Sequence, residues 1–227
     1  TALGYNDRNL RLLAVSALKA IGTPEAQSAL LVALSNDHIS VRLNAIQALR
    51  LTGCESAAPQ FTLLARTDES SDNRMAALSG LSELDPASSI PIAYVALSDK
   101  NARMVRTSLR ILTEHTSLIP ENVKFQILNK LSELRESRSV NIRKAVLSAW
   151  YSIDPDGSEA ILQSSLSDPV KAVRSTAQRL LFERSGGLPS VFTCREAIPS
   201  ESADDADDAD EIVDEEEIGY EDMDVIE

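Results

Sequence analysis

The sequence predicts an all-α protein, an α-solenoid of about six helix pairs followed by a disordered acidic C-terminal tail. The first observation is a pattern centred on an arginine that recurs about every 32 residues. The second is the composition, which is 43% hydrophobic but only 4% aromatic and includes just eight Gly, as is typical of packed helices. The third is that residues 196–227 hold 16 acidic residues and no Lys or Arg.

The recurring arginines are separated by 31, 32, 32, 37 and 31 residues. Three and six residues after each arginine stand mostly small or aliphatic residues, and seven residues after it mostly leucine. Offsets of three, four and seven lie on one face of a helix, so each arginine is predicted to begin the second helix of a pair. The arginines are Arg11, Arg42, Arg74, Arg106, Arg143 and Arg174.

The first helix of each pair is predicted from capping residues and prolines. Thr23-Pro24 and Asp85-Pro86 each place a capping side chain before a proline, which is favoured in the first helical turn. Pro91 is expected to delay or kink the second of these helices. Gly22 and Gly53 are expected to end helices in a left-handed conformation.

The repeat consensus, A-L-x-D-x-x-x-x-V-R-x-x-A-x-x-A-L-x-x-x-G, resembles the HEAT repeat over about residues 5–187. It is similar to the short form found in proteins like the phycobilisome lyases. The resemblance implies that an Asp/Arg pair is the structural signature of each repeat. The fifth repeat departs from it, with a longer first helix (121–135) and Ser139 where the acid would stand. The implied pairs are Asp37 with Arg42, Asp99 with Arg106, and Asp168 with Arg174.

These arginines and aspartates are interpreted as a structural ladder. In a solenoid each repeat contacts mainly its neighbours, so an arginine at the start of a second helix can bond a carboxylate or carbonyl in the adjacent repeat. The alternative is a basic stripe that binds a partner.

No catalytic, metal or cofactor site is predicted. The two cysteines, Cys54 and Cys194, lie 140 residues apart without a C-x-x-C motif. Neither His38 nor His115 belongs to a triad-like pattern. The sequence has no run of 18 apolar residues and no signal peptide in its polar start, which together with free thiols favours a cytoplasmic location.

A partner is expected on the concave face, which the second helices line in HEAT-like stacks. Residues 1–195 are slightly basic, with 19 acidic against 22 basic residues, which suits an acidic protein segment. The modest excess of positive charge and the absence of interleaved aromatics make nucleic acid an unlikely partner. The candidate partner-binding residues are Lys19, Arg50, Arg103, Arg110, Lys144, Lys171 and Arg179.

The chain is divided into a repeat solenoid (1–187) and an acidic tail or linker (188–227). Dense like charge predicts that the tail is largely disordered. Apolar residues among its carboxylates are the candidate for a recognition motif that docks in the groove of the same or another copy, and a linker is the other interpretation. The motif residues are Ile212, Val213, Ile218, Tyr220 and Met223.

Three hypotheses of function follow. The first is a non-catalytic scaffold or regulatory module that binds a protein on its concave face, with the expectation that it belongs to a larger protein or complex. The second, implied by the resemblance, is a chromophore lyase-like or chaperone-like enzyme. The third is a HEAT-like nucleic-acid repair protein, which a single Trp does not favour.

Overall fold

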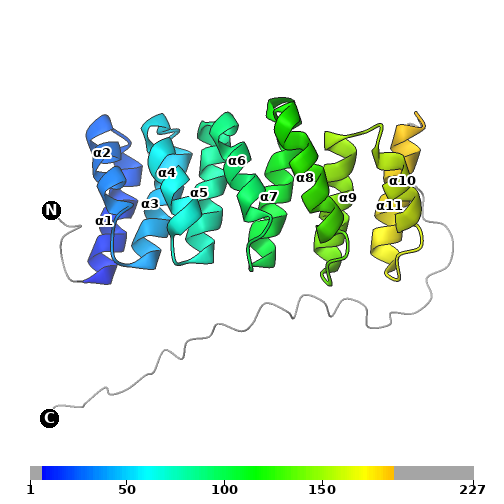
Figure 1. Ribbon diagram of the computed structural model, residues 1–227. Helices are drawn as coiled ribbons and strands as arrows, with labels where there is room; N and C mark the ends of the chain where they lie inside the picture. Colours follow the sequence, from blue (N-terminus) through cyan, green and yellow to red (C-terminus); the bar gives the residue numbers. More distant parts are fainter. Residues whose placement is uncertain (1–6, 187–227) are drawn as a thin grey trace, which may run out of the picture. The chain divides into compact units, whose positions relative to one another are not determined.

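The computed structural model describes residues 7–186, all of which belong to one compact unit, Thr1–Leu188 (Figure 1). These residues form α-helices with two short 3₁₀ turns, η2 (Glu55–Ala57) and η3 (Thr116–Leu118), and no strand. The α-helices of the described residues are α1 (Arg8–Ile21), α2 (Pro24–Ala33), α3 (Ile39–Leu51), α4 (Ala58–Thr67), α5 (Ser71–Leu84), α6 (Pro86–Ala96), α7 (Ala102–Glu114), α8 (Glu121–Leu134), α9 (Val140–Ile153), α10 (Ser158–Ser165) and α11 (Lys171–Arg184).

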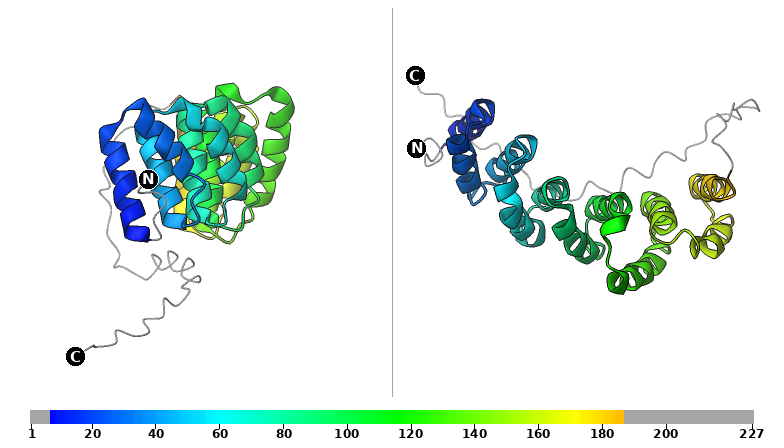
Figure 2. Two further views of the ribbon diagram at one scale, coloured as in Figure 1. Left: turned by 90° about the vertical axis from the view of Figure 1, so that its left-hand side faces the viewer. Right: turned by 90° about the horizontal axis from the view of Figure 1, so that it is seen from above.

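The described helices stack in antiparallel pairs, as the repeat predicts. Helix α1 carries the first arginine and is a second helix, and the complete pairs α2/α3, α4/α5, α6/α7, α8/α9 and α10/α11 follow it. Each second helix packs against the next one along the stack, whereas the first helices have few contacts with one another. The row of second helices therefore lies on the inside of a curved stack, and the first helices lie on the outside (Figure 2, right).

The predicted helix boundaries are confirmed where capping residues supplied them. The Thr23 Oγ1 accepts a hydrogen bond from the Ala26 N–H at the start of α2. Asp85 caps α6 in the same way, through the Ser88 N–H. Pro91 does not delay this helix: α6 begins at Pro86 and continues past Pro91, although a proline in the second turn removes one hydrogen bond of the helix.

Two apolar clusters fill the space between the rows of helices. The larger one extends from α1 to α9, and the smaller one joins α9, α10 and α11. Small residues on the second helices allow close approach, as predicted. The clearest case is Gly80 of α5, where an added Cβ would lie only 2.6 Å from the ring of the fully buried Phe61 on α4.

The fifth repeat is irregular, as the sequence predicts. Its first helix, α8, has 14 residues, compared with 10 for α2 and α4. The proposed tail motif, Ile212 to Met223, lies outside the described residues.

Candidate functional site

The arginine ladder is built from two positions defined by the N-cap of each second helix. The arginine stands four residues after the N-cap, and its acidic partner stands two residues before the N-cap of the next second helix. The best example joins Arg42 of α3 to Asp68, with Nε–Oδ2 and Nη2–Oδ1 distances of 2.7 and 3.0 Å. Nη1 of Arg42 meanwhile donates to the carbonyls of Asn36 and Asp37 in the turn before its own helix.

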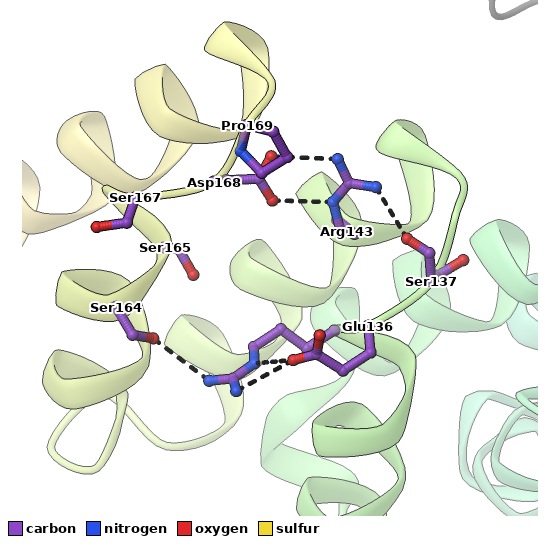
Figure 3. A pocket seen from close by; sticks show the side chains of 9 residues that line it. Glu136, Ser137, Arg143, Ser164, Ser165, Ser167, Asp168 and Pro169 are labelled. Carbon is purple, nitrogen blue, oxygen red and sulfur yellow. Dashed lines mark hydrogen bonds and ion pairs between the residues drawn. The ribbon is translucent and has the colours of Figure 1, made fainter.

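The same geometry recurs along the stack. Arg74 bonds Asp99, with its closest nitrogen–oxygen distance at 3.2 Å. Arg143 bonds Asp168 through Nε and Nη2, at 2.9 and 3.1 Å, while its Nη1 donates to the Ser137 carbonyl (Figure 3). Each guanidinium therefore ties the turn of its own repeat to the turn of the following one.

At the two ends of the ladder the arginines do not bond a carboxylate of the following repeat within the described residues. Arg11 reaches an amide instead of a carboxylate, with Nη1 3.3 Å from the Asn36 Oδ1. Arg174, in the last described helix, has hydrogen bonds within the described residues to the carbonyls of Asp168 and Pro169 alone.

The structure corrects the pairing expected within each repeat. Asp99 pairs with Arg74 and Asp168 with Arg143, so in both cases the arginine belongs to the preceding repeat. The carboxylate of Asp37 takes no part, because the position before the cap is filled by Asn36 and only the Asp37 carbonyl meets an arginine.

The sequence did not lead us to predict Asp68 as a member of the ladder, and the acid position of the fifth repeat was predicted at Ser139 instead of Ser137. Asp68 is the most buried acid of the ladder, with a side chain only 1% exposed. In the fifth repeat, the position of the acid is occupied by Ser137, whose Oγ accepts the Ser139 N–H, and Ser139 is the N-cap of α9. In the second to the sixth repeat the signal was an Asp, Asn or Ser two residues before a helix cap.

Arg106 does not belong to the ladder. Helix α7 is capped by Asn101, whose Oδ1 accepts the N–H groups of Arg103 and Met104. Four residues after this cap stands Val105, which is buried at 3% exposure, so Arg106 is one residue out of register. Val105 also faces a repeat that has Ser137 in the acid position, so this one junction lacks both members of the ion pair.

The burial of the ladder acids opposes their charge, and the arginines overcome it. Burial alone would raise the pKa of Asp68, but hydrogen bonds from Arg42, the Ser70 N–H and Asn73 hold this pKa below its usual value. Burial also acts to raise the pKa of Asp168, but hydrogen bonds from Arg143 and the Val170 N–H hold this pKa below its usual value. These acids are ionised structural groups.

Exposed and half-buried side chains of the second helices form the concave face, which we define by the positions two, five and nine residues after each N-cap. A hollow of about 580 Å³ opens there across α5, α7 and α9. On α7 all three positions are arginines, Arg103, Arg106 and Arg110, and all three line the hollow. Met75, Leu109 and Ala145 are among the other residues that line it, so charge and apolar surface lie together.

Most of the arginines on this face already have acidic neighbours. Arg110 lies 2.6 Å from Glu114 one turn later, and Arg103 lies 3.6 Å from Asp72 of α5. Among the described residues, Arg106 makes no hydrogen bond or ion pair, although it is exposed. Within residues 7–186, Arg106 is therefore the cation of the hollow that has no acidic partner.

The remaining predicted partner-binding residues spread along the stack. Arg50 of α3 pairs with Glu83 of α5 at 3.1 Å, and Arg179 pairs with Glu183 within α11. Lys144 is the residue of α9 that corresponds in position to Arg106. Lys19 lies in the last turn of α1 and Lys171 in the first turn of α11.

Other candidate groups have structural partners. His115 is half-buried, with its Nε2 2.9 Å from the Ser82 Oγ. Cys54 is a buried free thiol. Within residues 7–186, no group of His, Cys, Asp or Glu side chains is arranged to hold a metal ion. No helix in this range is long and apolar enough to cross a membrane.

A second hollow, of about 370 Å³, lies at the turns of the helix pairs α8/α9 and α10/α11 and is lined by the ion pair of Arg143 and Asp168 (Figure 3). Arg135 lines this hollow and bonds Glu136 and the Ser164 Oγ. Its charged groups are thus paired with one another.

Comparisons with known proteins agree with this architecture. A family model described as HEAT repeats matches residues 1–82. A designed armadillo repeat protein in complex with the peptide (KR)4 superposes with a TM-score of 0.56 at 15% identity, covering 81% of this chain and 96% of that one. The complex of CpcE and CpcF of phycocyanin lyase from Nostoc sp. gives a TM-score of 0.53 at 19% identity, covering 79% of this chain and 73% of that one.

A search of curated protein sequences gave no match. At these identities the structural likeness establishes the fold of the described residues. Function has to be argued from the concave face itself.

Proposed function

Because the chain is a HEAT-like repeat solenoid, we propose that it is a non-catalytic scaffold or regulatory module that binds a protein segment on its concave face. The observation that carries this proposal is the hollow of about 580 Å³ across α5, α7 and α9, where exposed arginines adjoin apolar side chains. A segment lying across these helices would bury apolar surface and form charge-assisted hydrogen bonds at once.

The likeness to designed armadillo proteins supports this mode of binding. One of them holds the peptide (KR)4, so an α-solenoid of this shape and length can hold a peptide. A groove lined by parallel helices presents side chains at regular intervals, which suits an extended segment.

Site-specific photo-crosslinking in cells tests the proposal. A photoreactive amino acid at Thr107, which lines the hollow, is expected to give a discrete crosslinked protein. The matched control is the same amino acid at Leu63, which is 60% exposed on α4 in the outer row of helices. Crosslinks of equal yield at both positions, or at Leu63 alone, would contradict a concave binding face.

The likeness to the CpcE and CpcF complex favours a second candidate, a chromophore lyase-like activity. This candidate requires reactive groups near a bound chromophore, whereas the side chains of the hollow are arginines, threonines and apolar groups together with Glu114 and Ser148. Absorption spectra of the protein mixed with an open-chain tetrapyrrole test it. A spectral shift that depends on the concave face would favour the lyase over the scaffold.

The acidic segment 196–227, with 16 carboxylates, is a further part of the proposal. Either it docks on a concave face, in the same or another copy, or it is a linker. A cytoplasmic location likewise stays a prediction.

A further inference from the structure

The fourth repeat has exchanged a structural arginine for an exposed one. In the second helices α3, α5, α9 and α11 the residue four positions after the N-cap is an arginine that bonds backbone carbonyls of its own turn. In α7 this position holds Val105, and the arginine comes one residue later. One residue along a helix is about 100°, which moves the guanidinium from the edge of the stack to the concave face.

The start of α7 is fixed by its own hydrogen bonds. The Asp99 Oδ1 accepts the Asn101 N–H at 2.8 Å, and the Asn101 Oδ1 accepts the Arg103 N–H at 2.8 Å. Since Arg74 also bonds Asp99, the turn is anchored from two sides. Arg106 is therefore held on the concave face by the framework, and its position does not depend on a loop.

The charges around Arg106 define what would bind it. Asp72 lies beside Arg103 and Glu114 beside Arg110, so two of the three arginines of α7 have acidic neighbours. Arg106 has none among the described residues, and the half-buried side chains of Met75 and Ala145 offer apolar surface close by. A carboxylate bound here would gain a charge-assisted hydrogen bond, with apolar contacts for the side chain next to it.

We propose that the concave face binds an acidic peptide segment of a partner protein, and that Arg106 is the residue that anchors one of its carboxylates. This inference rests on the proposed function and names the chemistry of the partner. It reverses the charge seen in the designed armadillo complex, whose peptide is (KR)4. Lys144, which occupies the same position on α9, extends the positive surface to the next repeat.

The test measures binding of two fluorescent peptides to the full chain by anisotropy at low salt. The probes are (DE)4 and its uncharged counterpart (NQ)4, which have the same length and differ in charge. The (DE)4 peptide is expected to bind and (NQ)4 to bind more weakly. For (DE)4, Arg106→Gln is expected to raise the Kd about tenfold, the usual effect of losing one hydrogen-bonded ion pair with partial solvent access.

Two further variants control for charge and folding. Arg66→Gln removes one exposed cation from α4, on the outer row, and is expected to leave the Kd unchanged. The exchange Val105→Arg with Arg106→Val keeps the composition and net charge but moves the cation off the concave face. It is expected to weaken binding as much as Arg106→Gln, with the circular dichroism of Arg106→Gln showing that the fold is intact.

The inference is overturned if (DE)4 does not bind, if (NQ)4 binds equally well, or if Arg66→Gln weakens binding as much as Arg106→Gln. These outcomes are separable from failure of the proposed function. If a protein is crosslinked at Thr107 but Arg106→Gln leaves the Kd for (DE)4 unchanged, the scaffold function is retained and the acidic partner is rejected. Binding of (DE)4 at Arg106 without any crosslinked protein would retain the anion site and reject the scaffold.

Discussion

Removing the carboxylate of Asp68 should lower the free energy of unfolding far more than removing the carboxylate of an exposed acid. In the change Asp68→Ala, four hydrogen bonds disappear: two from Arg42, one from the Ser70 N–H and one from Asn73. The two charged side chains are 10% and 1% exposed, so water cannot replace the lost partner.

The magnitude follows from this burial. Breaking a buried ion pair by removing one partner costs about 3–5 kcal/mol, since the other charge is left without compensation. Here Arg42 keeps a bond to Glu69 and two to carbonyls, so the loss should lie at the lower end, about 3 kcal/mol. The exposed pair Arg110–Glu114, with side chains 50% and 45% exposed, provides the comparison, and Glu114→Ala should cost at most about 0.5 kcal/mol.

The assay is urea unfolding followed by far-UV circular dichroism, with the slope m compared between variants. Asp68→Ala is expected to lower the midpoint with little change in m, and Glu114→Ala to leave it nearly unchanged. A difference of less than about 1 kcal/mol between the two variants would refute the view that the ladder stabilises the stack.

A double-mutant cycle provides a further test. It places at Arg42 and Asp68 the residue types that the protein has at the same ladder positions between α7 and α9. There the ladder positions hold Val105 and Ser137, which need no ion pair. Arg42→Val combined with Asp68→Ser should therefore be more stable than the sum of the single changes implies. The expected coupling is about 2 kcal/mol, within the range of contacting residues, and strict additivity would contradict it.

Three further predictions concern packing, pH and capping. Gly80→Ala should destabilise by about 1–3 kcal/mol, because the new methyl group would overlap the buried ring of Phe61. Acid should destabilise the stack: Asp68 and Asp168 have lowered pKa values, so their stabilisation is complete above the unfolded pKa of about 4 and is lost as the pH falls through the lower folded values. Thr23→Ala should cost about 1 kcal/mol by removing the cap of α2.

Each of these has a matched control in the same denaturation assay. Ser79→Ala, beside Gly80 on α5, should have a small effect, and an equal loss at both positions would argue against the overlap. Asp68→Asn should flatten the acid limb of stability against pH, whereas Asp156→Asn, at an exposed site before α10, should not. Ser28→Ala on the exposed side of α2 tests whether the loss at Thr23 is specific to the cap.

Much of the fold could be predicted because its information is local. Helix caps at Thr23 and Asp85, the positive-φ glycines Gly22 and Gly53, and the spacing of apolar residues all act within one or two turns of chain. Repetition then multiplies a weak local signal, since six similar segments agree on the same pattern. The longer helix α8 was visible for the same reason, as one interval that is too long.

The candidate site was harder to predict because it depends on register. The interval of 32 residues from Arg74 suggests that Arg106 belongs to the ladder, yet the cap at Asn101 starts α7 so that Val105 takes that place. The sequence contained the signal: starting from Val105, the residue seven positions later is Leu112, which matches the leucines of the other repeats better than Thr113 does. A single residue of offset decides whether an arginine supports the stack or faces the groove.

By itself the sequence determined the helix pairs and their alternation, because both are set by contacts between residues close along the chain. Only the tertiary structure decided which carboxylate each arginine meets, since Arg42 and Asp68 are 26 residues apart and come together when one pair packs on the next. It also decided that Arg106 lacks a partner among the described residues and lines a hollow. Hydrogen bonds between repeats depend on the rotation of whole helices, and that rotation is fixed by packing.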